Sequence, residues 1–253
     1  MMLMQIVVDS LLTAYERQGS GKVVVFLHGW GDSMASSQAL RAELSKKFEV
    51  VALDLPGFGG TQAPEAAWGL DEYAAFVAHF LAKIGLDETY AFMGHSNGGA
   101  MVIRGLANGL FTAEKALLLA SAGIRAPKSL RLKMLKAVAR TVKVAIRPLP
   151  ASIQKRMRGK AYQAIGSDYL AAPHLQETFR RVVSEDVRGD AAQLTMPVLL
   201  IYGEQDTAAP VWYGELYHEL MVDSTLVVLP GAGHFVYLDR PDDVLRQVQE
   251  FLA

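Results

Sequence analysis

The residues best suited to chemistry lie in the segment GHSNGG, at positions 94–99. This segment has the pattern G-x-S-x-G and stands directly between a strand pattern and a helical pattern. A strand, a sharp turn and a helix in that order would raise the Ser96 hydroxyl above the sheet, with Gly94 and Gly98 leaving room for the turn. A helix N-terminus also favours developing negative charge. The context therefore favours a nucleophilic serine over one that only caps the helix.

A serine hydroxyl is a weak nucleophile at neutral pH and needs a base within hydrogen-bond reach. His234 lies in PGAGH, a small-residue segment after the last strand pattern, which predicts a place beside Ser96. We therefore assign it the role of general base. His28 and His95 are predicted to orient loops. His79, His174 and His218 are predicted to lie on the solvated surface.

A carboxylate is expected to hold the histidine in the correct tautomer and to stabilise its protonated form. Asp206 suits this role because it ends the strand pattern PVLLIYGEQD, and because the chain order serine, aspartate, histidine fits a nucleophile elbow in a sheet of this kind. Glu204 is the alternative, although its position two residues earlier could direct it away. Asp223 and Asp239 are interpreted as turn and surface residues.

The segment HGWGDS, at 28–33, follows the first long strand pattern. Its glycines would let the backbone turn with amide groups facing the nucleophile. We predict an oxyanion hole formed by two backbone N–H groups, those of Trp30 and Asn97. The Trp30 indole would either line the acyl pocket or pack beneath the loop.

These residues must be positioned by alternating strands and helices. Apolar runs typical of strands buried in a parallel sheet cover 23–29, 49–57, 89–96, 115–123, 197–206 and 224–234. Helical spacing of apolar residues covers 33–47, 71–85, 97–109, 211–221 and 241–252. The alternation predicts an α/β fold with a mostly parallel, doubly wound sheet and a site beyond the carboxyl ends of the strands. The first 18 residues are interpreted as a strand and not as a signal peptide.

Between the strand patterns ending near Gly123 and beginning at Pro197, only broken helical patterns occur. The predicted organisation is a core of residues 1–124 and 194–253, interrupted by a helical cap of residues 125–193.

The predicted cap is strongly basic. Residues 125–190 hold 15 Lys and Arg against 5 Asp and Glu, a net charge of +10, while the remainder holds 10 against 21, a net charge of −11. Three interpretations compete. The charges are the solvated face of amphipathic helices; they attract an acidic partner or an anionic substrate; or a helix over 128–147 lies on an anionic lipid surface.

Composition excludes several kinds of chemistry. The chain has no cysteine, so disulfides, thiolate nucleophiles and cysteine-bound metals are absent. No metal-ligand cluster, P-loop or dinucleotide-binding motif appears, and we expect no metal, no cofactor and no nucleic-acid partner. No run of about 18 apolar residues predicts a membrane-spanning helix. A cytoplasmic protein is the default expectation.

The segments HGWGDS, DLPGFGGT, GHSNGG, YGEQDTAAP and GAGHFVYLDRP resemble, in this order, the signature segments of the α/β-hydrolase superfamily. The resemblance covers the chain outside the predicted cap and implies that fold and a triad of Ser96, Asp206 and His234. HGWG and DLPGFG are also similar to carboxylesterases that cleave the methyl ester of pimeloyl carrier protein. The segments GHSNGG and FVYLDRP differ from the corresponding segments of those carboxylesterases. The similarity therefore predicts only the type of reaction for this chain.

The family includes several chemistries. Dehalogenases and epoxide hydrolases use an aspartate where this chain has Ser96, and C–C hydrolases typically have Trp where this chain has Phe235. The expected function is ester hydrolysis on a small-molecule substrate through an acyl-enzyme on Ser96. Two alternatives stay open: a C–C bond hydrolase on the same triad, and a non-catalytic relative that binds a ligand in the same pocket.

Overall fold

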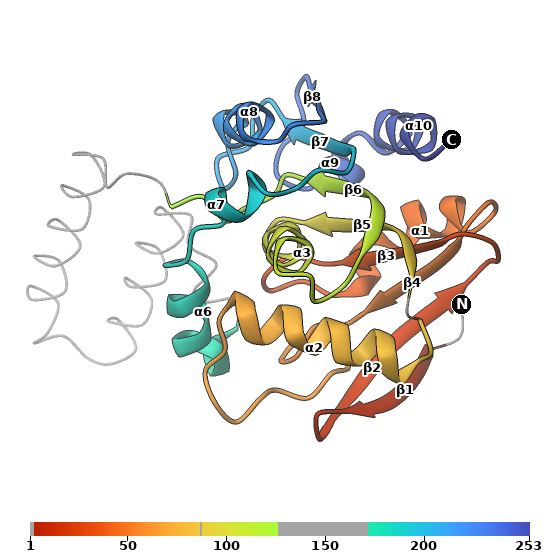
Figure 1. Ribbon diagram of the computed structural model, residues 1–253, viewed down its shortest axis with the longest axis vertical. Coiled ribbons are helices and arrows are strands. Elements are labelled where there is room, and N and C mark those ends of the chain that lie inside the picture. Colours follow the sequence, from red (N-terminus) through yellow and green to blue (C-terminus); the bar gives the residue numbers. More distant parts are fainter. Residues whose placement is uncertain (1–2, 87, 126–171) are drawn as a thin grey trace, which may run out of the picture.

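The computed structural model describes residues 3–86, 88–125 and 172–253. Within them, eight strands form one sheet in the order β1-β2-β4-β3-β5-β6-β7-β8 (Figure 1). Strands β3 to β8 pair in parallel with one another, whereas β2 pairs antiparallel with both β1 and β4. The strand bounds are Leu3–Val8 (β1), Leu11–Gln18 (β2), Val23–Leu27 (β3), Glu49–Leu53 (β4), Thr89–His95 (β5), Ala113–Leu119 (β6), Val198–Gly203 (β7) and Ser224–Leu229 (β8). The predicted mostly parallel sheet is therefore confirmed.

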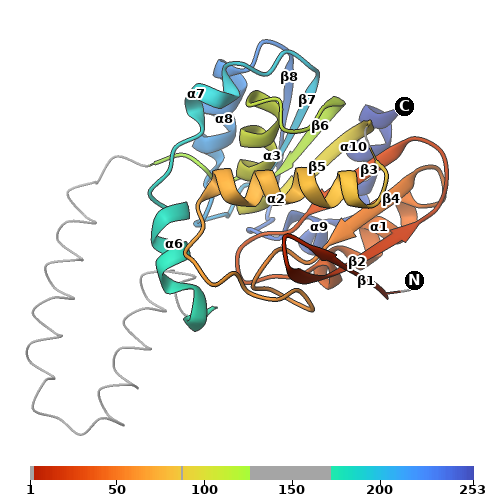
Figure 2. The ribbon, with the colours of Figure 1, turned by 60° about the horizontal axis from the view of Figure 1, so that its bottom comes forward.

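Helices cover both faces of the sheet, as Figure 2 shows. The described helices are η1 (Met34–Ser37), α1 (Gln38–Leu44), α2 (Leu70–Lys83), α3 (Asn97–Ala107), η3 (Pro173–Leu175), α6 (Gln176–Val182), α7 (Arg188–Ala191), α8 (Val211–Leu220), α9 (Val236–Asp239) and α10 (Pro241–Leu252). Helices α2, α3 and α8 pack on one face, and α1, α9 and α10 pack on the other.

Alternation along each strand builds two hydrophobic cores. In β3, Val25 and Leu27 face the first group of helices, whereas Val24 and Phe26 face the second. Every residue of β5 and β7 is buried, which explains their uninterrupted apolar runs. The sequence predicted β8 as buried on both faces, but it lies at the edge of the sheet and Val228 is exposed.

The N-terminus corrects one prediction. In place of a single strand, β1 and β2 form a hairpin whose turn residues, Asp9 and Ser10, both have positive φ values, of 47° and 66°. Positive φ at both central residues is the signature of the type I′ turn, which suits the right-handed twist of the two strands. Type I′ turns usually contain glycine, but neither central residue of this turn is one.

The predicted cap falls largely outside the described residues, since 126–171 are not among them. Its C-terminal part, with η3, α6 and α7, is described and packs against the core (Figures 1 and 2). Among the residues that the structure describes, no helix has the length and apolar composition needed to cross a bilayer.

Candidate active site

Ser96 occupies a strained turn between β5 and α3. Its φ of 53° and ψ of −119° lie in a region that residues with a side chain rarely adopt. The flanking glycines permit this turn: a Cβ on Gly94 would lie 2.6 Å from the carbonyl carbon of Gly98, and one on Gly98 would lie 2.3 Å from the carbonyl oxygen of Leu27. The predicted turn that presents the Ser96 hydroxyl is present.

Three side chains that are distant in the sequence meet beyond the carboxyl ends of the strands. His234 Nε2 lies 3.0 Å from Ser96 Oγ, and His234 Nδ1 lies 2.7 Å from Asp206 Oδ2. With a proton on Nδ1 donated to the carboxylate, the lone pair of Nε2 faces the serine hydroxyl. This arrangement can remove the hydroxyl proton as the oxygen attacks an electrophile.

Asp206 is held by the backbone as well as by the histidine. Its side chain is fully buried, and Oδ1 accepts hydrogen bonds from the N–H groups of Ala208 and Ala209 at 2.8 and 3.0 Å. These donors compensate the burial of a charged group. Glu204, the alternative carboxylate, is exposed and accepts the N–H of Gly231 at 3.0 Å, so it lies away from the histidine.

Asp239 has a structural role that the sequence does not reveal. It is exposed, as predicted, but its Oδ2 accepts the N–H of Gly233 at 2.7 Å and so holds the loop that carries His234. The spacing of six residues between donor and acceptor has no recognisable pattern in the sequence.

The backbone N–H groups of Trp30 and Asn97 were predicted to form the oxyanion hole. Both residues line the same cavity as the serine. Within the described part of the chain, neither backbone N–H has a hydrogen-bond acceptor. Two unpaired donors beside a nucleophile could stabilise a developing oxyanion.

His28 fixes the loop that carries Trp30. It is fully buried, its Nδ1 donates to the carbonyl oxygen of Gly29 at 2.8 Å, and its Nε2 accepts the N–H of Leu55 at 2.9 Å. Burial lowers the pKa of His28, which keeps the ring neutral and able to both donate and accept. The predicted role in loop orientation agrees with these contacts.

His95 connects the turn at Ser96 with the loop that carries His234. Its Nε2 donates to the backbone carbonyl oxygen of His234 at 3.0 Å, and the two imidazole rings lie 4.9 Å apart. Burial, and next the charge of His234, lower the pKa of His95 to about 3. The ring is therefore neutral at physiological pH.

A cavity of about 400 Å³ opens beside Ser96. Trp30 lines it, and the Trp30 ring also packs on Phe58 and Phe179, with ring centroids 5.0 and 5.2 Å apart. Val182, on α6, continues the wall. The volume of this cavity is within the range of small-molecule sites.

Across the described residues, no group of three or more His, Asp or Glu side chains could hold a metal ion.

Comparison with known proteins identifies related sequences. Residues 24–247 match the family described as "Alpha/beta hydrolase family". An uncharacterized protein of Mycobacterium tuberculosis (strain ATCC 25618 / H37Rv) is 26% identical, over 94% of this chain and 77% of that protein. The pimeloyl-[acyl-carrier protein] methyl ester esterase of Aliivibrio salmonicida is 25% identical, over 94% and 95%. The 2-hydroxy-6-oxo-6-(2'-aminophenyl)hexa-2,4-dienoic acid hydrolase of Metapseudomonas resinovorans is 23% identical, over 95% and 87%.

Solved structures share the fold. A bacterial membrane phospholipase A superposes with a TM-score of 0.79 at 24% identity, covering 99% of this chain and 85% of that one. The enol-lactonase of Burkholderia xenovorans LB400 superposes with a TM-score of 0.77 at 20% identity, covering 98% and 99%. These likenesses show the α/β-hydrolase fold.

Proposed function

Because this chain belongs to the alpha/beta hydrolase family, we propose that it is a serine hydrolase that cleaves carboxylic esters through an acyl-enzyme on Ser96. The observation that carries the proposal is the relay of hydrogen bonds from Ser96 Oγ to His234 Nε2 and from His234 Nδ1 to Asp206. A serine beside a base, which is in turn oriented by a carboxylate, is the arrangement that nucleophilic acyl transfer requires.

The chemistry follows from this arrangement. His234 accepts the hydroxyl proton while Ser96 Oγ attacks the ester carbonyl carbon, and the N–H groups of Trp30 and Asn97 stabilise the resulting oxyanion. The protonated His234 then donates to the leaving alcohol, which leaves an ester on Ser96. Water, activated by His234, attacks that ester and releases the acid.

The relatives support a hydrolase and differ in the bond they cleave. One carries the name of a methyl ester esterase and another the name of a dienoic acid hydrolase, each at about a quarter identity or less. C–C bond hydrolysis on the same triad is therefore the second candidate. A non-catalytic ligand-binding relative is disfavoured because the three triad positions are filled and in contact.

We also propose that residues 125–193 form a cap over the site. The described part of this segment supports it, since Phe179 and Val182 on α6 form one wall of the cavity beside Ser96. The basic residues of 126–171, and with them the predicted acidic partner or anionic lipid surface, lie outside the described residues.

Hydrolysis of p-nitrophenyl esters from acetyl to palmitoyl tests the proposed function, with a serine-reactive fluorophosphonate as a label. Wild-type protein should turn over esters and take up the label, and Ser96→Ala should lose both. Ser224→Ala is the matched control, since that hydroxyl contacts His218 on the surface and not the site. A folded wild type that shows neither turnover nor labelling would remove the ester proposal in favour of C–C hydrolysis or ligand binding.

A further inference from the structure

The cavity beside Ser96 is bounded by the proposed oxyanion donors and not by the proposed base. Ser96, Trp30 and Asn97 line it, whereas His234 does not. In ester cleavage the leaving alcohol must lie next to the histidine that gives it a proton. The acyl group is then left to the cavity that His234 does not line.

Most of the cavity wall is apolar. Trp30, Ile124, Phe179, Val182 and Val183 provide aromatic and aliphatic surface. Burying a hydrocarbon chain against such a wall stabilises binding by about 25 cal/mol for each Å² of apolar area removed from water. This surface suits an aliphatic or aromatic acyl group.

One charged side chain interrupts the wall, and it is an acid. Glu185 lines the cavity, and no Lys, Arg or His is among its described lining residues. Oε1 of Glu185 accepts the N–H of Leu70 at 3.0 Å, which fixes the carboxylate at the start of α2. The described wall therefore offers a negative charge and no positive one to a bound acyl group.

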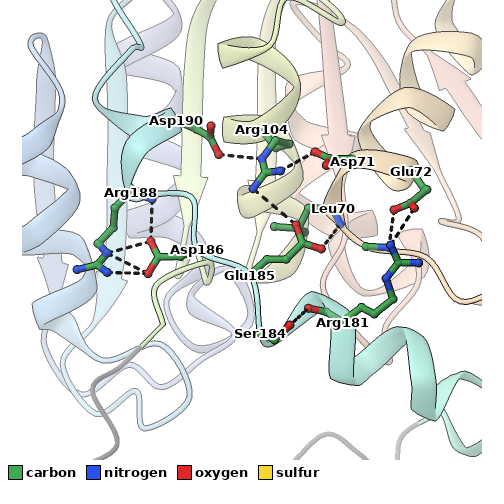
Figure 3. A network of polar contacts seen from close by, with 11 residues as sticks. Leu70, Asp71, Glu72, Arg104, Arg181, Ser184, Glu185, Asp186, Arg188 and Asp190 are labelled. Atoms are coloured by element: carbon green, nitrogen blue, oxygen red, sulfur yellow. Dashed lines mark hydrogen bonds and ion pairs between the residues drawn. The ribbon is translucent and has the colours of Figure 1, made fainter.

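The neighbouring arginine does not cancel this charge. Figure 3 shows Arg104 between three carboxylates, with Nη2 3.6 Å from Glu185, Nη1 2.5 Å from Asp71 and Nε 2.8 Å from Asp190. One guanidinium and three carboxylates leave this group with a net charge of −2. The longest of the three contacts is the one to Glu185. From the described residues, a carboxylate brought into the cavity would meet an excess of negative charge while losing its own hydration.

We infer that the cavity beside Ser96 takes an uncharged, apolar acyl group, and that Glu185 is the residue that excludes acyl groups ending in a carboxylate. This inference rests on the proposed ester hydrolysis. It would set the protein apart from hydrolases whose substrates carry a carboxylate at that end.

Matched p-nitrophenyl esters test the inference. Hexanoate is compared with the adipate half-ester, and octanoate with the suberate half-ester, so that each pair differs in a terminal carboxylate at equal chain length. The methyl-capped diesters control for bulk. Wild type should show kcat/KM at least ~30-fold higher for the neutral member, and Glu185→Gln should reduce that ratio by ~10-fold, since one like charge near a desolvated group changes binding by about a factor of ten.

Glu114→Gln is the matched control. It removes a carboxylate that is exposed, pairs with Lys22, does not contact Arg104 and does not line the cavity, so activity and ratio should stay at the wild-type values. Equal turnover of both members by wild type would overturn the inference and leave ester hydrolysis intact, as would a ratio that Glu185→Gln does not change. Absence of turnover for every ester would instead refute the proposed function.

Discussion

Nε2 of His95 donates a hydrogen bond to the backbone carbonyl oxygen of His234, at 3.0 Å. The residue that precedes the proposed nucleophile thus holds the loop of the proposed base. A Cβ on Gly29 would lie 3.0 Å from His95 Nδ1, so the same ring also packs on the loop that leads to Trp30. The imidazole of His95 therefore lies between the two loops on which the site depends.

Replacing His95 should reduce turnover without removing the proposed triad. Asn would place its amide near the position of Nδ1 and lose the bond to His234, whereas Gln would place its amide near Nε2 and keep it. We expect His95→Asn to lower kcat by ~10- to 100-fold with little change in KM, because small misplacements of a base are costly. His95→Gln should recover most of the loss.

Steady-state kinetics of both variants check this prediction, with urea unfolding to separate positioning from stability. Two variants of equal unfolding free energy that differ in kcat would support a positioning role for His95. Full activity in His95→Asn would show that the His234 loop needs no such support.

The two carboxylates that follow β7 should differ sharply in effect. Asp206→Asn keeps the shape but favours the wrong histidine tautomer, so we expect kcat to fall by ~10³- to 10⁴-fold. Glu204→Gln should keep wild-type turnover, because Glu204 contacts Gly231 and not His234. Turnover of a single ester by both variants tests this assignment. A large loss of kcat in Glu204→Gln would mean that Asp206 is wrongly assigned as the carboxylate that orients His234.

Much of the fold, and the meeting of Ser96, Asp206 and His234, could be predicted from the sequence, because each depends on local pattern and chain order. Buried parallel strands have continuous apolar runs, and the strand ends bring Ser96, Asp206 and His234 to one edge of the sheet. The choice of Asp206 over Glu204 was predicted but is explained only by the backbone turn after β7, which directs the two side chains apart.

Other features depend on contacts that no sequence spacing reveals. The group around Arg104 joins α2, α3 and α7 with the segment that follows α6, across more than a hundred positions. The hairpin at Asp9 and Ser10 was missed because its left-handed residues are not glycines. The bond from His95 to His234 likewise requires the fold to bring β5 beside the loop after β8.

The turn at Ser96 should tolerate no added atom at Gly98. A Cβ there would lie 2.3 and 2.6 Å from the carbonyl oxygens of Leu27 and His28, and backbone atoms cannot rotate aside as a side chain can. We expect Gly98→Ala to lower the free energy of unfolding by ~2–3 kcal/mol, more than the gain in helix propensity returns.

Gly189→Ala is the matched control, because a Cβ at Gly189 on α7 meets nothing within 4 Å. Its unfolding free energy should change by no more than ~1 kcal/mol, and in the stabilising direction. Urea denaturation measures both variants. Equal stabilities would contradict the close packing of α3 against β3.

Stability should fall on acidification, partly through His95. Burial lowers the pKa of His95 from the ordinary value of 6.5 to about 3, so the unfolded chain takes up a proton between these values while the folded protein does not. Proton uptake by the unfolded state favours unfolding, and one such group costs about 1.4 kcal/mol for each pH unit below the ordinary value. His95 therefore contributes stability that is present above pH 6.5 and is lost toward pH 3.

Comparison of wild type with His95→Gln isolates this contribution. The glutamine cannot titrate but can keep the bond to His234, so the variant should lose less stability than wild type between pH 7 and pH 5. His28, whose pKa burial also lowers, titrates in both proteins and leaves a residual slope in each. Urea denaturation at several pH values measures the difference. Parallel curves for the two proteins would mean that His95 takes up its proton in the folded state at an ordinary pH, and that its ring is less buried than the structure shows.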